Sequence, residues 1–141
     1  MPNFAAFDPD AYRKLSVEDK FKRLKTSLPS IRETLKPEKP LEDINLSYIA
    51  GIKKELQEYI SFIGPVVIDD EPAMMLEEIR FLETSCKSIS SVYDALKEAM
   101  TWLRVAADSQ KINKFDIQTR FGYYECLDNC FKALNRAIQN I

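Results

Sequence analysis

Histidine is absent from this sequence of 141 residues. Ser-His-Asp and Cys-His catalytic sites, imidazole proton relays and histidine-containing metal sites all depend on that side chain. Its absence excludes them, together with a di-iron bundle built from Glu-x-x-His pairs. Any catalysis would have to use carboxylates or thiols alone, so we predict that the protein is not an enzyme.

Glycine is also scarce. The three glycines, Gly51, Gly64 and Gly122, are isolated from one another, and no G-x-x-x-x-G-K sequence is present. A phosphate-binding loop needs several closely spaced glycines so that backbone amides can approach the phosphates. We therefore expect no nucleotide cofactor, and the prediction for cofactors as a whole is none.

Long apolar runs are missing as well. No window of 18 consecutive apolar residues exists, as a membrane-spanning helix would require. The first eight residues have neither the basic start nor the apolar stretch of a signal peptide. We predict a cytoplasmic protein that does not contact a membrane.

The three cysteines form an odd set, with Cys126 and Cys130 four residues apart and Cys86 possibly opposite them. Without an export signal, free structural thiols are the simplest interpretation, and a redox or metal role is the alternative. Asp69, Asp70 and Glu71 could form a weak divalent-cation site. Helix capping explains these acids more simply, so we predict no metal site.

Charge is unevenly distributed although the net charge is only −2. Between Ala11 and Lys39 there are nine basic and four acidic residues, whereas Pro40–Ser85 contains three basic and ten acidic residues. The simplest interpretation is that the basic N-terminal segment folds against the acidic middle of the chain. The alternative is a contact of the same kind with a partner.

The N-terminal half predicts short helical pieces. Residues 1–15 show no sustained period and are predicted to be an irregular arm, followed by a single domain over residues 16–141. Ser16 is an expected N-cap, and Pro29 is expected to begin a second short helical piece. A further helix is predicted from about Asp43 or Asn45 to Ile63, where Gly64 and Pro65 should end it.

The most informative pattern begins at Pro72 and continues to Ala107 without a helix breaker. Apolar residues follow each other there at alternating steps of four and three, which is a heptad seam. Its members are Met75, Ile79, Leu82, Cys86, Ile89, Tyr93, Leu96, Met100, Leu103 and Ala107. A second stripe of mostly small residues lies beside the seam, with Phe81 and Trp102 near its two ends. We predict one continuous helix of ~54 Å that is contacted on two sides.

The last helix is predicted to run from about Ile117 to the C-terminus and to pair with the preceding helix as an antiparallel hairpin. The fold class is therefore all-α: an antiparallel up-and-down helical bundle of three long helices plus short N-terminal helical pieces.

For function we predict a non-enzymatic protein–protein interaction protein, such as an adaptor, chaperone-like binder, inhibitor or assembly subunit, which acts through helical faces as a homodimer. This prediction depends on one continuous helix from Pro72 to Ala107, and it should be abandoned if that helix is broken in two or folds around a deep polar cavity with converging acids. The Phe4/Phe7 arm either docks on a partner or folds back on its own bundle. The predicted partner-binding residues are Phe4, Phe7, Arg13, Lys20, Lys22, Arg23, Phe81 and Trp102.

Two alternatives remain. The basic segment Arg13–Lys25, with Tyr12 and Phe21 as neighbouring aromatic residues, could bind nucleic acid. The acidic pI of about 5.3 argues against attraction of a polyanion. A carboxylate- or thiol-based enzyme is the second and less favoured alternative.

Overall fold

The computed structural model describes residues 7–35, 46–68, 76–112 and 117–141, and every regular element in these ranges is a helix. Four helices are long: α2 (Val17–Thr34), α3 (Leu46–Ile68), α5 (Ile89–Ile112) and α6 (Ile117–Gln139). Two are short: α1 (Pro9–Arg13) and α4 (Leu76–Ser85). The all-helical prediction is confirmed.

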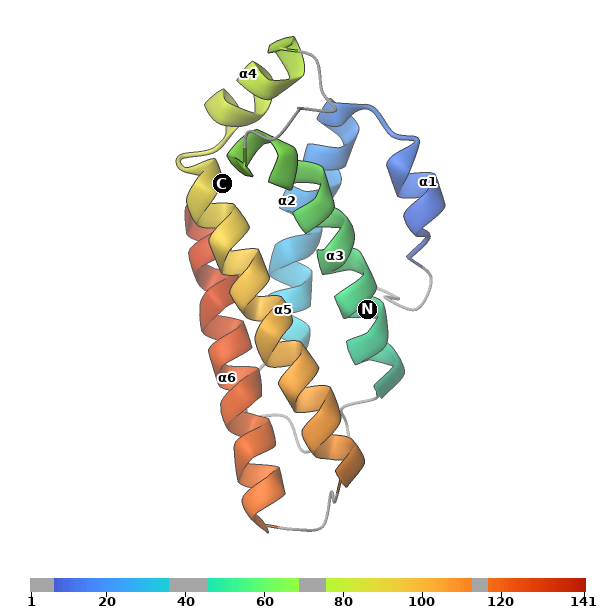
Figure 1. Ribbon diagram of the computed structural model, residues 1–141, viewed down its shortest axis with the longest axis vertical. Helices are drawn as coiled ribbons and strands as arrows, with labels where there is room; N and C mark the ends of the chain where they lie inside the picture. The colour runs from blue at the N-terminus through green and yellow to red at the C-terminus, as the bar shows by residue number, and fades with distance from the viewer. Residues whose placement is uncertain (1–6, 36–45, 69–75, 113–116) are drawn as a thin grey trace.

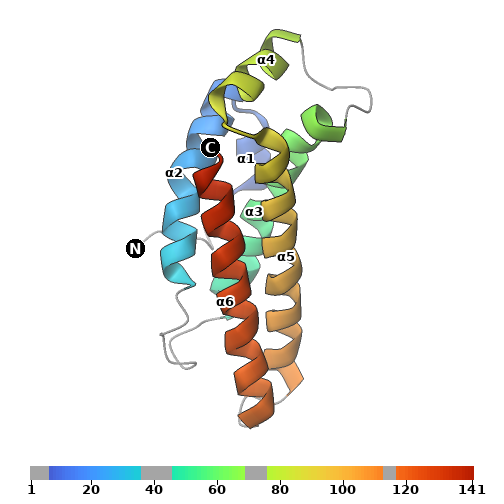
Figure 2. The same ribbon diagram turned by 90° about the vertical axis from the view of Figure 1, so that its left-hand side faces the viewer.

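The four long helices form a closed ring in which consecutive helices run in opposite directions (Figures 1 and 2). α5 packs against α6 on one side and α3 on the other, and α2 contacts both α6 and α3. α1 lies against α3, while α4 lies across the end of the bundle and contacts α2. The helical bundle is confirmed. Within the described residues it has four long helices, one more than the three predicted, because α2 is a single long helix.

The fourth long helix arises because α2 passes through Pro29. A proline in a helix interior costs ~3 kcal/mol through its lost amide and its clash with the preceding turn. Leu28, Ile31 and Leu35 continue the stripe of Leu24 and are almost completely buried. Each such side chain gains ~1.5–3 kcal/mol on burial, so together they outweigh the proline. Pro29 therefore lies inside α2 and does not begin the second helical piece that was predicted.

Burial of apolar side chains also outweighs a helix-breaking signal in α3, which extends beyond its predicted end. The helix continues through Gly64 and Pro65 to Ile68, where a stop and a buried linker were predicted. Gly64 is buried beside the Tyr93 ring of α5, and Val66 and Val67 pack partly against the core. Burial of this turn against α5 overrides the local stop signal.

The predicted continuous helix from Pro72 to Ala107 is wrong. It is interrupted at residues 86–88, which separate α4 from α5. The amides of Lys87 and Ser88 donate to the Asn140 carbonyl oxygen at the end of α6, at 2.9 and 3.2 Å. The Ser88 hydroxyl accepts a hydrogen bond from the Ser91 amide at 3.3 Å and so caps α5. These amides have hydrogen-bond partners other than the carbonyl groups of a preceding helical turn. The chain can therefore leave the helix here although the heptad pattern continues.

Both predicted stripes of the α5 part are nevertheless used. Tyr93, Leu96, Met100 and Leu103 of the seam are buried, and so are Val92, Ala95, Ala99 and Ala106 of the small-residue stripe. Contact on two sides is confirmed, since α5 packs against both α6 and α3. These partners come from the same chain, so the seam no longer supports a protein-binding role. Among the described residues, no helix is long and apolar enough to cross a bilayer.

The N-terminal segment is more regular than predicted. Asp8 caps α1 by accepting from the Asp10 amide at 3.0 Å, and Ser16 caps α2 by accepting from the Asp19 amide at 3.2 Å. The Ser16 cap is confirmed, whereas the irregular arm is wrong for Pro9–Arg13. Phe7 and Tyr12 both belong to the hydrophobic core. Of the two interpretations of the arm, the Phe7 part therefore folds back on its own bundle.

Candidate functional site

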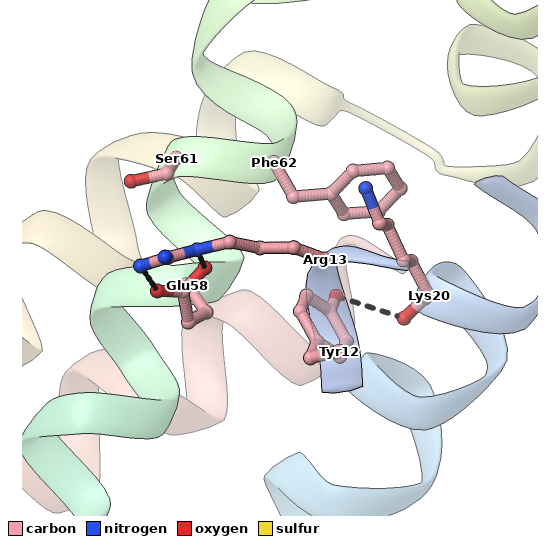
Figure 3. Close-up of a pocket in the computed structure, with 6 residues that line it drawn as sticks. All are labelled: Tyr12, Arg13, Lys20, Glu58, Ser61 and Phe62. Carbon is pink, nitrogen blue, oxygen red and sulfur yellow. Dashed lines mark hydrogen bonds and ion pairs between the residues drawn. The ribbon is translucent and has the colours of Figure 1, made fainter. Parts of the chain in front are cut away.

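A half-open cavity of about 220 Å³ lies where α1, α2 and α3 meet (Figure 3). It is lined by Tyr12, Arg13, Lys20, Glu58, Ser61 and Phe62. The residues come from the basic N-terminal part of the chain and from the acidic part that follows it. The cavity is therefore at the meeting point of the two oppositely charged segments.

Arg13 and Glu58 form the central ion pair of this site (Figure 3). The Arg13 Nη2 and Nε atoms donate to the two Glu58 carboxylate oxygens at 2.5 and 3.1 Å. Glu58 is nearly buried, while most of the Arg13 side chain is exposed. The hydrogen bonds to Glu58 raise the pKa of the Arg13 guanidinium, so Arg13 keeps its proton. A two-point pair of this geometry fixes orientation as well as position.

A second carboxylate lies one helical turn before Glu58. Glu55 is 1% exposed and accepts a hydrogen bond of 2.6 Å from the Tyr59 hydroxyl. The Arg23 guanidinium lies 4.0 Å from its other oxygen. Burial, and then the nearby Glu55 charge, raise the pKa of Tyr59, which keeps its proton available for donation. Both buried acids of α3 thus have partners within the fold.

Aromatic rings surround these ion pairs. The Tyr12 ring packs edge-on against Tyr59 and Phe62, with centroids 5.4 and 6.4 Å apart, and Phe7 lies 5.7 Å from Tyr12. The Tyr12 hydroxyl donates to the Lys20 carbonyl oxygen at 3.1 Å. We call the surface formed by Glu55, Glu58, Tyr59 and Phe62 of α3, with Lys20 and Arg23 of α2 beside them, the α2–α3 groove. Residues 7–13 lie against it.

Cations lie over two of the rings. The Lys20 ammonium is 5.6 Å from the Phe62 ring centroid, and the Arg23 guanidinium is 5.7 Å from that of Phe7. Cation–π contacts of this kind add ~0.5–1 kcal/mol at exposed positions. The basic N-terminal segment therefore does fold against the acidic middle of the chain, as the simpler interpretation of the charge pattern predicts.

The structure brings together four of the predicted partner-binding residues. Phe7 and Arg13 contact the α3 side of the α2–α3 groove, and Lys20 and Arg23 lie on its α2 side beside Phe62 and Glu55. Lys22 is exposed on α2. Phe81 and Trp102 lie elsewhere: Phe81 packs edge-on against Phe21 at 5.9 Å, and Trp102 is partly buried on α5. Phe4 lies outside the described residues.

Sequence reasoning missed the α3 half of the site. Glu55 and Glu58 lie next to Leu56 and Tyr59, within the apolar pattern of α3. An acid beside a buried stripe, in a segment opposite in charge to its neighbour, was the available signal. This signal indicates which segment holds the internal partners of the basic segment, but it does not single out these two carboxylates.

The thiols are buried and free, as their structural interpretation predicts. Burial raises the pKa of Cys130 to about 12, and it also raises the pKa of Cys86 and of Cys126. Within the described part of the chain, no group of three or more metal-ligating side chains is found. The acids Asp69, Asp70 and Glu71 lie outside the described residues.

Comparison with protein-family models, with curated proteins and with solved structures finds no match to this chain. The geometry of the α2–α3 groove is therefore the basis for the proposed function.

Proposed function

We propose that the protein is a non-enzymatic interaction protein that binds a short helical segment of a partner in the α2–α3 groove. One observation carries the proposal: the groove holds such a segment already, supplied by residues 7–13 of the same chain. A surface that accommodates this segment within the chain has the shape and charge to accept a similar segment from another one.

The contacts define the chemistry of the ligand. Phe7 and Tyr12 place two aromatic rings against Tyr59, and Arg13 places a guanidinium on Glu58. Aromatic residues and arginine carry most of the binding free energy in protein interfaces, particularly where their contacts exclude water. The expected ligand is a short amphipathic helix with aromatic side chains on one face and an arginine beside them, bound helix-in-groove.

The resident segment competes with such a ligand. A covalently attached segment has an effective concentration in the millimolar range, so a partner must bind more tightly or meet a protein whose segment is released. Phe7–Arg13 is thus an internal competitor, and its release would be required for binding.

The nucleic-acid alternative loses part of its support from the same contacts. Arg13, Lys20 and Arg23 make their contacts with Glu58, Phe62 and Glu55. A phosphate would have to displace these contacts. The exposed side chains of Lys14, Lys22 and Lys25 remain, and they lie on the surface of an acidic protein.

The experiment uses a fluorescent peptide of residues 7–16 as the probe. It is titrated into the full chain carrying Phe7→Ser and Arg13→Glu, which releases the resident segment. Fluorescence anisotropy should show saturable binding to this variant and at least about tenfold weaker binding to wild type. The matched control peptide carries Tyr12→Ser and Arg13→Glu. Equal binding of both peptides, or no binding by a variant with a wild-type circular dichroism spectrum, would refute the proposal.

A further inference from the structure

We propose that the cavity between α1, α2 and α3 binds a small organic anion, made of one aromatic ring and one carboxylate, which holds residues 7–13 against the bundle. This ligand is distinct from the helical partner proposed for the α2–α3 groove. Because that partner requires release of residues 7–13, the ligand would oppose its binding; this consequence alone rests on the proposed function.

The charged side chains around the cavity leave one positive charge unbalanced. Arg13 is paired with Glu58, whereas no ion pair of Lys20 is found among the described residues. The Lys20 ammonium instead lies 5.6 Å from the centroid of the Phe62 ring, away from the Arg13–Glu58 pair (Figure 3). An ammonium group beside a partly enclosed space attracts a negative charge more strongly than it would in open solvent. One unbalanced cation fits a ligand that carries one negative charge.

The cavity walls and volume define the rest of the ligand. The Tyr12 and Phe62 rings, whose centroids are 6.4 Å apart, are mostly buried and provide aromatic surface, while Ser61 is exposed at the rim. The volume of about 220 Å³ is below the ~300–1,000 Å³ of sites for drug-sized ligands. It therefore suits a single ring that packs on the aromatic wall, with its carboxylate directed to Lys20.

The cavity exists only while the N-terminal segment is docked. Its lining residues come from three elements: Tyr12 and Arg13 belong to α1, Lys20 belongs to α2, and Ser61 and Phe62 belong to α3. Separation of α1 from the bundle removes one wall of the cavity. A ligand that binds only the docked state stabilises that state by mass action. The expected effect of the ligand is slower release of residues 7–13.

Phenylacetate is the probe for this site. Phenylacetamide, which has the same ring and nearly the same shape without the charge, and phenethylamine, which carries a positive charge, are the matched control compounds. In an amide NMR titration of the full wild-type chain, phenylacetate should shift the signals of Tyr12, Lys20 and Phe62 in a saturable way. Its affinity should exceed that of phenylacetamide by at least about tenfold, and phenethylamine should not bind.

Lys20→Met keeps an unbranched side chain over Phe62 and removes the ammonium group. The variant should lose the preference for phenylacetate over phenylacetamide. Lys22→Met is the matched control variant, because Lys22 is exposed on the same helix and does not line the cavity; it should retain the preference. Both variants should keep the wild-type circular dichroism spectrum. Equal affinities of the two compounds for the wild type, or an unchanged preference in a folded Lys20→Met variant, would overturn the proposed site.

Hydrogen exchange measures the effect of the ligand on the docked segment. The amides of Tyr12, Lys14 and Leu15 are hydrogen-bonded within the segment and its turn. At a phenylacetate concentration about ten times its Kd, their exchange through release of the segment should slow about tenfold. The variant with Phe7→Ser and Arg13→Glu should no longer bind phenylacetate. Binding with no change in the exchange of these amides would contradict the proposed link to docking.

The outcomes separate this ligand from the proposed function. If phenylacetate binds and slows exchange while the peptide of residues 7–16 does not bind the groove, the cavity site is retained and the groove proposal is wrong. If the peptide binds and phenylacetate does not, the cavity site is wrong and the groove proposal is retained.

Discussion

The guanidinium of Arg13 donates two hydrogen bonds, of 2.5 and 3.1 Å, to the carboxylate of Glu58, which lies 45 residues later in the sequence. The pair joins the short helix α1 to the middle of α3. Because Glu58 is nearly buried, removal of Arg13 would leave a carboxylate without its strongest partner. This relationship makes the N-terminal segment part of the fold.

The Tyr59–Glu55 hydrogen bond should contribute to global stability. Tyr59→Phe leaves the buried Glu55 carboxylate without its hydroxyl donor, so we expect the free energy of unfolding in urea to fall by ~1.5–3 kcal/mol. Tyr93→Phe is the matched control, because no hydrogen bond from the Tyr93 hydroxyl is found among the described residues; it should change stability by less than ~0.5 kcal/mol. Equal effects of the two substitutions would show that the Glu55 contact is not needed.

The break between α4 and α5 should depend on its serine cap. Ser88→Ala removes the oxygen that accepts from the Ser91 amide, and we expect a loss of ~1 kcal/mol with an unchanged denaturant m-value. Lys87→Ala, at the exposed position one residue earlier, is the control and should change stability by less than ~0.5 kcal/mol. If Ser88→Ala stabilised the protein instead, a continuous helix through this region would be the better description.

Cys130 should be unreactive and should make stability depend on alkaline pH. Burial raises its pKa from 9.0 to about 12, so the folded state keeps a proton that the unfolded state loses above pH 9. The contribution of the protonated Cys130 thiol to the free energy of unfolding is therefore complete below pH 9. It declines as pH rises from 9 toward 12, by ~1.4 kcal/mol per pH unit.

Urea titrations at pH 8, 9 and 10 measure this slope, and Cys130→Ala should remove part of it. Ellman's reagent at pH 8 should modify Cys130 only when the protein unfolds. Rapid modification of Cys130 in the folded protein would contradict its burial and would restore the redox interpretation of the thiols.

Patterns that are buried by neighbouring helices were predictable from the sequence. The α6 helix, the Ser16 cap and the two contact faces of α5 all follow from apolar spacing or capping chemistry. The errors concern places where local and tertiary free energies compete. Pro29 and Pro65 remain inside helices because burial outweighs their cost, and the break at residues 86–88 exists because Asn140, far along the chain, accepts its amides.

The candidate site was predictable on one side only. Phe7, Arg13, Lys20 and Arg23 are predicted as binding residues because a basic and aromatic cluster is visible in the sequence. Their receptors Glu55 and Glu58 were not, because a single acid beside an apolar stripe resembles many solvated helix faces. The charge separation predicts that the basic segment contacts the acidic one, but it does not predict which residues of the two segments pair.

Native-state hydrogen exchange of the α1 amides tests most directly the central claim, that residues 7–13 form a docked segment which can separate from the bundle. The amides of Tyr12, Lys14 and Leu15 are hydrogen-bonded within this segment and its turn. They should exchange more slowly than in a free peptide, yet faster than the buried amides of α3 and α5, and Glu58→Gln should accelerate them selectively. The account is contradicted if these amides exchange as in a free peptide, or only through global unfolding with no selective response to Glu58→Gln.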